Sequence, residues 1–267
     1  MKLTTSIALL CTALISSQAN AHSRWILPSH FTLSSDKGEW IALDITASNE
    51  TFHVDKAMSV DNMRITLPNG KSERPSSVYK AHRKSVADYY VKDGGTYKIT
   101  SNGSPSYFSS YELDGEKKRF RGNKQALLAA QPKATKVKTF YRFARIESYV
   151  TMNQPTENYA LDGIALEVKP VTHPSEIIES EPAQFQLLYN GKPQQGVKIE
   201  ITKEGSRYRN APETIELTSD KNGMVEVTLP SAGRFLFIAE YQQQAKNKQL
   251  ADVEGGEVFL TIESQLN

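Results

Sequence analysis

The chain has almost no cysteine, since Cys11 is the only one among its 267 residues. A chain with one cysteine forms no internal disulfide bond and no zinc site built on several thiolates. Beyond residue 21 there is no thiol at all, so no cysteine nucleophile is available there. The folded part must therefore be stabilised by its hydrophobic core, which a chain of this length is able to bury.

Long apolar runs are also absent. The longest, residues 6–15, is too short to span a membrane. It follows a short positive start and precedes Ala-Asn-Ala at residues 19–21, which has the small residues of a signal-peptidase site. We therefore predict a secretory signal peptide over 1–21, a mature chain that begins at His22, and a periplasmic location. The alternatives are an uncleaved anchor and lipoprotein processing at Cys11.

Neither sign of charge dominates. Removal of Lys2 with the signal peptide leaves 31 of the 32 lysine and arginine residues against 30 acidic residues, a formal net charge of +1. No domain-scale basic excess would attract nucleic acid or anionic lipid. We expect no nucleic-acid partner and no direct insertion into a membrane.

Common catalytic motifs are missing as well. The chain has no G-x-S-x-G nucleophile motif, no phosphate-binding loop and no G-x-G-x-x-G. No H-x-H or H-x-x-x-H pair is present, which argues against a compact structural zinc site. We expect a binding protein rather than an enzyme.

The sequence does contain many strand-like segments separated by turns. Alternating apolar and polar residues, with aromatic and β-branched side chains, predict single strands over residues 39–48, 63–71, 94–103, 106–113, 138–152, 165–171 and 257–264. Two strands around a turn are predicted within 183–202, and three strands within 214–241. One helix is predicted over 123–131, capped by Asn123 and ended by Pro132.

This pattern predicts an all-β protein with two β-sandwich domains. The polar, turn-rich segment 153–163 marks the boundary, which gives an N-terminal β-rich domain over 22–155 and a C-terminal sandwich over 160–267. The C-terminal strands recur every 8–15 residues or so, a spacing typical of an immunoglobulin-like or transthyretin-like sandwich. The predicted helix belongs to the N-terminal domain.

Several stretches together resemble one exported family. A G-K-P-x-x-G-V-x-I hairpin occupies 191–199, and the wider pattern covers residues 21–33, 166–177 and 205–223. The combination is similar to the family called domain of unknown function 4198 (DUF4198). That family is loosely associated with the periplasmic component of cobalt or nickel transport. The resemblance implies a membrane transporter component as partner, and it assigns no ligand residue.

A mature N-terminal His22 suggests a metal site. Its α-amine and imidazole Nδ1 can chelate one ion, and a second histidine would complete a histidine brace. Such nitrogen ligands suit copper, nickel and cobalt. We predict that His53, flanked by Glu50 and Asp55, is the second ligand, followed in preference by His82 and then His30. Alternatively, His22 is only the residue that the protease leaves behind.

The remaining candidates have both a functional and a structural interpretation. Arg207 and Arg209 flank Tyr208 and are able to bind a carboxylate or phosphate. If the stretch is a strand, both arginines share one face; alternatively it is a hairpin loop whose arginines pair with Glu213 or Glu216. His82 is a ligand candidate or a solvated surface residue among basic neighbours, and His173 is a turn residue whose ring binds a backbone carbonyl.

The leading hypothesis is a periplasmic binding protein that captures a nickel, cobalt or copper ion, or its chelate, for uptake. The alternative is a non-catalytic structural or interaction protein of the bacterial envelope. A third hypothesis, a brace-type copper oxidase, requires a substrate surface around His22.

Overall fold

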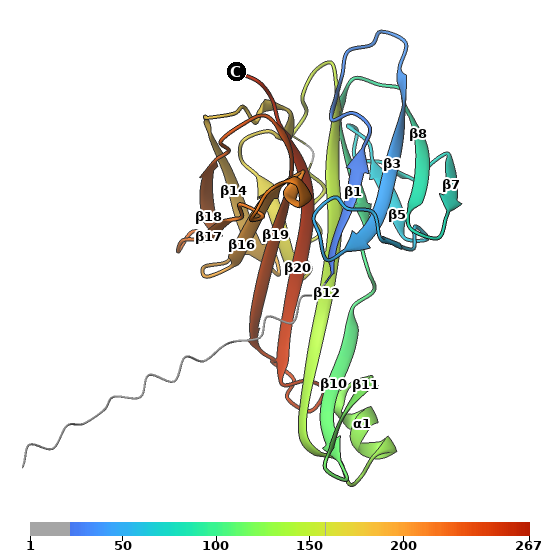
Figure 1. Cartoon of the computed structure of the whole chain (residues 1–267), viewed down its shortest axis with the longest axis vertical. Coiled ribbons are helices and arrows are strands. Elements are labelled where there is room, and N and C mark those ends of the chain that lie inside the picture. Colours follow the sequence, from blue (N-terminus) through green and yellow to red (C-terminus); the bar gives the residue numbers. More distant parts are fainter. Residues whose placement is uncertain (1–21, 158) are drawn as a thin grey trace, which may run out of the picture.

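The computed structural model describes residues 22–157 and 159–267, so the predicted signal peptide lies outside the described residues. The described chain is mostly β-structure with one α-helix, as the sequence predicts. Figure 1 shows two lobes side by side above a narrow arm, with the long strand β12 running from the lobes into the arm. No helix among the described residues is long and apolar enough to cross a membrane.

The first sheet forms the outer layer of the N-terminal lobe. Its strand order is β1-β3-β8-β7, and β4 pairs with β3. These strands are β1 (Ser23–Pro28), β3 (Glu39–Ser48), β4 (Lys56–Ala57), β7 (Ser77–Lys80) and β8 (Ser85–Val91).

The second sheet runs through both lobes and the arm. Its main order is β17-β16-β19-β20-β12-β9-β5-β6, with β2, β10 and β11 attached at β12 and β10. Its strands are β2 (Thr32–Leu33), β5 (Met63–Thr66), β6 (Ser72–Glu73), β9 (Gly95–Ser101), β10 (Ser106–Leu113), β11 (Glu116–Arg121), β12 (Thr135–Met152), β16 (Lys198–Lys203), β17 (Ile215–Thr218), β19 (Gly233–Gln244) and β20 (Val253–Ser264).

The third sheet forms the outer layer of the C-terminal lobe. It has the order β13-β14-β15, with β18 also paired to β14. Its strands are β13 (Leu166–Pro170), β14 (Pro182–Tyr189), β15 (Lys192–Pro193) and β18 (Met224–Thr228), and two short 3-10 helices accompany this half, η1 (Pro174–Glu176) and η2 (Ser206–Tyr208).

Two hydrophobic cores lie on opposite faces of the second sheet. Side chains alternate between the faces of a strand, so Phe235 and Phe237 of β19 join the C-terminal core, whereas Leu236 joins the N-terminal core. Phe259 of β20 likewise belongs to the N-terminal core. The strand pair β19–β20 thus contributes side chains to the cores of both lobes. The predicted domain boundaries at residues 155 and 160 stay a prediction.

The helix α1 (Lys124–Ala130) confirms the sequence prediction closely. The Asn123 side chain caps it by accepting a hydrogen bond from the Ala126 N–H at 2.8 Å. Leu127 is fully buried against the arm. The helix ends before Pro132, which has no N–H to continue it.

A group of buried charges lies where β12 meets the C-terminal lobe. Lys98 Nζ is 3.1 Å from Glu147 Oε2, and both side chains are almost completely buried. Arg145 donates from Nε to the Leu166 carbonyl at 3.1 Å and also binds Asp162. Burial opposes the shift, but hydrogen bonds from Arg145 and a backbone N–H hold the pKa of Asp162 below its usual range.

His173 connects the two lobes. Its Nδ1 accepts a hydrogen bond from the Ser175 N–H, so the neutral ring carries its proton on Nε2 and donates it to Thr96 Oγ1 of β9 at 2.9 Å. His173 therefore lies in a turn as predicted; its ring contacts the Thr96 hydroxyl and also makes a backbone hydrogen bond with Thr156. Burial lowers the pKa of this imidazole.

Candidate functional site

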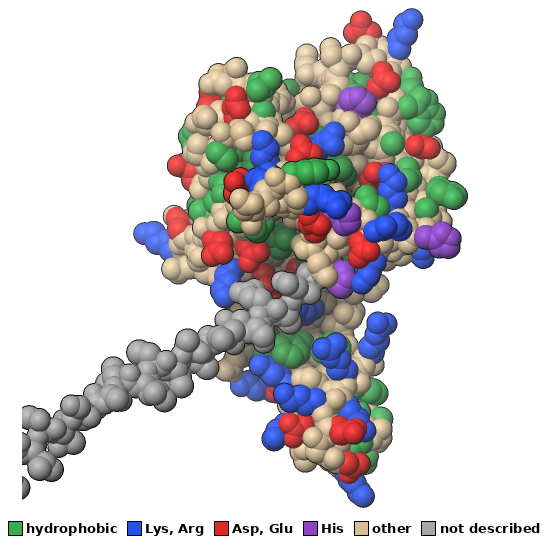
Figure 2. All heavy atoms as spheres, in the orientation of Figure 1, with side chains coloured by type: hydrophobic (Ala, Val, Ile, Leu, Met, Phe, Trp, Pro, Cys, Tyr) green, Lys and Arg blue, Asp and Glu red, His purple; other side chains and the backbone are tan. Residues whose placement is uncertain are grey.

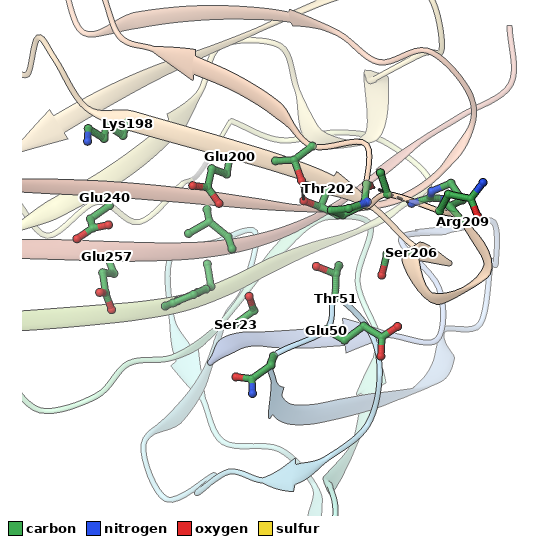
Figure 3. Close-up of a pocket in the computed structure, with 17 residues that line it drawn as sticks. Ser23, Glu50, Thr51, Lys198, Glu200, Thr202, Ser206, Arg209, Glu240 and Glu257 are labelled. Carbon is green, nitrogen blue, oxygen red and sulfur yellow. Dashed lines mark hydrogen bonds between the residues drawn. The ribbon is translucent and has the colours of Figure 1, made fainter. Parts of the chain in front are cut away.

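A cleft of about 540 Å³, here called the interlobe cleft, opens between the N-terminal and C-terminal lobes (Figure 3). Its floor is formed by β16, β19 and β20, one wall by Ser23 and residues 49–51, and one end by the loop after β16. Figure 3 shows Glu200, Glu240 and Glu257 on the strands, with Glu50 opposite them on the N-terminal lobe.

Strand register explains why carboxylates gather on this floor. Lys198 of β16 lies opposite Glu240 of β19, and Glu240 lies opposite Glu257 of β20. Ile199 and Phe237, on the other face of these strands, are buried in the C-terminal core. The core thus holds the apolar half of each strand and directs its polar half into the cleft.

Two pairs of carboxylates face each other across neighbouring strands. Glu240 and Glu257 are joined by Arg142, which lies 2.8 Å from Glu257 and 3.9 Å from Glu240. Glu200 of β16 lies opposite Glu216 of β17, and neither makes an ion pair among the described residues. Like charges directly opposite in a sheet are unfavourable; Arg142 offsets this repulsion for Glu240 and Glu257, which leaves Glu200 as the floor carboxylate without an ion pair among the described residues.

The loop from Ser206 to Thr214 closes one end of the cleft. Arg209 donates from its guanidinium to the carbonyls of Lys203 and Glu204 at 2.9 Å, and it lies 3.3 Å from Glu213. The stretch is thus a loop with a 3-10 turn, and the pairing of an arginine with Glu213 agrees with the hairpin-loop interpretation rather than with a strand. Tyr208 points away into solvent and is 86% exposed. Ligand binding by Arg207, Tyr208 and Arg209 stays a prediction.

His22 lies at the rim of the cleft, directly before the lining residue Ser23. Its Nε2 is 2.6 Å from Lys56 Nζ. A lysine ammonium has only donors, so this contact requires that His22 Nε2 accept and that the neutral ring carry its proton on Nδ1. A metal ion at Nδ1 would displace that proton and with it the contact to Lys56.

His53 meets one of the predicted arginines. Its Nδ1 lies 3.3 Å from a guanidinium nitrogen of Arg207. His53 follows the cleft-lining loop 49–51, and Arg207 precedes the lining residue Arg209. The structure therefore gathers His22, His53 and the Arg207–Arg209 loop around one cleft, although each was identified from a separate stretch of sequence.

The other histidines lie farther along the N-terminal lobe. His82 is exposed in the turn between β7 and β8, and its neighbour Arg83 lies 3.7 Å from Asp55. His30 binds Ser29 after the end of β1, at 3.1 Å. No group of three or more His, Cys, Asp and Glu side chains able to hold a metal occurs within 22–157 and 159–267. The roles of His22, His53 and His82 as metal ligands stay predictions.

Sequence reasoning did not identify the cleft carboxylates. Glu200, Glu240 and Glu257 are scattered over three strands, and their convergence depends on strand order. The alternation in K-I-E-I-T (198–202) does indicate which side chains leave the core, but it does not reveal which strands are neighbours.

The solved structures that match this chain are only distantly similar to it. The D0-D1 domain of Intimin is 12% identical, with 92% of this chain and 100% of that chain covered and a TM-score of 0.24. The adhesin InvE of Yersinia pseudotuberculosis is 13% identical, with 90% and 60% covered and a TM-score of 0.24. A DUF4785 family protein from Legionella pneumophila subsp. pneumophila str. Philadelphia 1 is 9% identical, with 80% and 50% covered and a TM-score of 0.25.

No curated protein matches the chain. A family model does match, over residues 19–243, which include the cleft floor up to β19, the loop with Arg207 and all five histidines. The protein belongs to the family described as domain of unknown function (DUF4198).

Proposed function

We propose that the protein is a periplasmic binding protein that holds a small chelate of nickel, cobalt or copper in the interlobe cleft and delivers it to an uptake system. The observation that carries this proposal is the cleft itself. Its lining has four carboxylates, those of Glu50, Glu200, Glu240 and Glu257, against the two cations Lys198 and Arg209.

The dimensions and charges of the cleft favour a chelate over a bare ion. A volume of about 540 Å³ falls in the range of about 300–1,000 Å³ typical of small-molecule sites. Carboxylates attract the metal centre, while Lys198 and Arg209 suit the carboxylates of an organic chelator. A bare ion would need several ligands within one coordination sphere, and the described residues offer no such group.

His22 adds a ligand at the rim. In a chain cleaved after Ala21, its α-amine and Nδ1 form a chelating pair beside Ser23. These two groups could replace two ligands of the incoming chelate and fix it at the cleft entrance. Metal binding would be strongest at neutral and higher pH, because the amine and the imidazole must lose their protons to coordinate.

Calorimetry with the exported protein tests the proposal. The protein, with its native N-terminus, is titrated with Ni(II), Co(II) and Cu(II), each alone and as its histidine complex. We expect tighter binding of at least one complex than of the free ion, and weaker binding in the variant Glu200→Gln/Glu257→Gln.

A matched control removes two carboxylates that do not line the cleft, Glu181→Gln/Glu226→Gln, which also changes the net charge by +2. If both double variants bind like the parent protein, or if no complex binds, the cleft is not a chelate site.

The alternative, an interaction protein of the envelope, is favoured by a different part of the molecule. The arm formed by β10, β11 and β12 exposes one uncovered sheet face.

A further inference from the structure

The arm carries an unusual concentration of positive charge. Residues 106–142 contain nine lysine and arginine residues and three acidic residues, a formal net charge of +6. The rest of the chain beyond residue 21 then has a net charge of −5. Figure 2 shows Lys and Arg side chains clustered over the narrow lower part of the molecule, with a few carboxylates near its tip. The net charge of the whole chain is near zero only because the positive arm and the negative remainder cancel.

Strand register places these cations on one face of the arm. Arg121 of β11 lies opposite Phe108 of β10, which lies opposite Phe140 of β12. One row farther along, Arg119 lies opposite Ser110, which lies opposite Lys138. Lys117 follows by the same alternation, opposite Glu112, whose carboxylate pairs with Lys136. We call this surface, made of Lys117, Arg119, Arg121, Lys138, Phe108 and Phe140, the basic face.

The opposite face of the arm is already covered. Leu127 of α1 and the β-strand residues Ser109 and Thr139 are all fully buried. Ser109 Oγ and Thr139 Oγ1 share a hydrogen bond of 2.8 Å there. Because α1 covers that side, the basic face is the side of the arm that remains open to solvent.

The cations of the basic face have no partner of opposite charge. Lys118, Lys124 and Lys136 of the arm all pair with carboxylates. Among the described residues Lys117, Arg119, Arg121 and Lys138 make no ion pair, and two of them rest on aromatic rings instead. Arg119 lies 5.9 Å from the Phe108 ring centre, and Lys138 lies 5.2 Å from that of Phe140.

We propose that the basic face docks the protein on the surface of an anionic phospholipid bilayer. A flat sheet with four unpaired cations is complementary to a plane of phosphate charges. Phe108, 37% exposed, adds an apolar side chain able to enter the headgroup region. The net charge of −5 on the remainder is repelled by the same surface. The bilayer therefore holds the protein by the arm.

Vesicle sedimentation tests this docking with the full exported chain. The probes are vesicles of phosphatidylcholine alone and of phosphatidylcholine with about one third phosphatidylglycerol. We expect binding to the anionic vesicles only, and a steep loss of binding as salt rises to 0.5 M, because exposed charges are then screened. The variant Lys117→Gln/Arg119→Gln/Arg121→Gln should reduce partitioning by about 100-fold, at about fivefold for each charge.

A matched variant distinguishes the basic face from net charge alone. Lys169→Gln/Lys192→Gln/Lys221→Gln removes two exposed lysines of the third sheet and one of the turn before β18 and should bind vesicles much like the parent protein. Equal losses in both triple variants would overturn the proposal, as would equal binding to neutral vesicles. Retention on heparin or DNA without binding to anionic vesicles would also overturn it, since the partner would then be a different polyanion.

The two proposals fail separately. The arm variant leaves every cleft-lining residue intact, so its affinity for a metal chelate should equal that of the parent protein. A loss of both activities in this variant would indicate misfolding, which a thermal unfolding curve detects; the single variant Arg119→Gln then replaces it, with an expected loss of about fivefold.

Discussion

His53 and Arg207 are 154 positions apart in the chain, yet 3.3 Å separates the imidazole Nδ1 from a guanidinium nitrogen. Because His53 belongs to the N-terminal lobe and Arg207 to the loop after β16, the contact joins the two lobes. It lies beside the cleft-lining residues Thr51 and Ser206 in the sequence. Any metal that binds His53 at Nδ1 must first displace Arg207.

The contact of His173 with Thr96 predicts a pH-dependent stability. Burial lowers the pKa of His173 in the folded protein, whereas the unfolded chain has the ordinary value near 6.5. The unfolded state therefore binds more protons as the pH falls through about 6.5, and the free energy of unfolding decreases there. A backbone hydrogen bond with Thr156, and then the charges of Glu176 and Glu157, oppose this lowering of the pKa only partly.

Urea unfolding of the parent protein and of His173→Asn between pH 8 and 5 measures this effect. The variant should be less stable at pH 8, because it loses the hydrogen bond to Thr96. Its decrease in stability between pH 7 and 5 should be smaller than that of the parent protein. Parallel curves would show that His173 does not titrate with folding.

The buried pair Lys98–Glu147 predicts a large loss of stability when one partner is neutralised. Glu147→Gln leaves the Lys98 ammonium buried without its carboxylate at 3.1 Å, and such uncompensated charges cost about 3–5 kcal/mol. The double variant Lys98→Met/Glu147→Leu removes both charges and should cost clearly less. Chemical denaturation of the three proteins gives the comparison. If Glu147→Gln is more stable than the double variant, the prediction that an unpaired buried Lys98 is the larger cost is wrong.

Much of the fold was predictable from local sequence patterns. The strand over 39–48 has the bounds of β3, and the helix over 123–131 begins after its predicted cap Asn123. These elements depend on patterns among residues close in sequence, namely side-chain alternation in the strand and capping in the helix. The predictions missed β1, β7, β8 and β11, and the two-residue strands β2, β4 and β6. The first four pair with β3, β8 or β10, which are distant or separate stretches of sequence.

The candidate site was less predictable because it depends on long-range pairing. His22, His53 and Arg207 have recognisable chemistry, and each was identified singly. Glu200 and Glu257 became neighbours of the same cleft only through the order β16-β19-β20. The basic face of the arm was hidden for another reason: its charge is cancelled in the total by acids elsewhere in the chain.

Replacing the glycine in the turn before β18 should reduce stability more than replacing a glycine in an open turn. Gly223 has φ of 72°, and a Cβ there would overlap the Leu187 carbonyl oxygen and lie 2.9 Å from the Gln194 nitrogen. Gly115 has φ of 82°, but a Cβ there meets nothing within 4 Å. Gly115→Ala should therefore cost only the backbone strain of about 1–2 kcal/mol. Gly223→Ala should cost about 1–3 kcal/mol more, because backbone atoms must shift.

Thermal and urea unfolding of both glycine variants test this difference. Both substitutions reduce the flexibility of the unfolded chain equally, so the comparison isolates the steric term. Equal stability of the two variants would show that the turn around Gly223 adapts without strain.

The contact between His22 and Lys56 leads to the prediction that most directly tests the metal site. Lys56 Nζ lies 2.6 Å from His22 Nε2, which favours the ring form whose Nδ1 is protonated and unable to coordinate. Removing the ammonium with Lys56→Met frees the other ring form. Metal affinity at the native N-terminus should therefore increase in this variant, by about tenfold for each 1.4 kcal/mol of lost competition.

Calorimetric titration with Cu(II) and Ni(II) at pH 7.5 compares five proteins: the parent with His22 first, a form with one added N-terminal alanine, Lys56→Met, His53→Ala and His30→Ala. The added alanine separates the amine from the His22 ring and should weaken binding sharply. His53→Ala should weaken it by about 10–100-fold, or about 1.4–2.8 kcal/mol. His30 binds only Ser29 in the structure, so His30→Ala should bind like the parent. If the extended chain binds as tightly as the parent and Lys56→Met changes nothing, His22 coordinates no metal and is only the first residue of the exported chain.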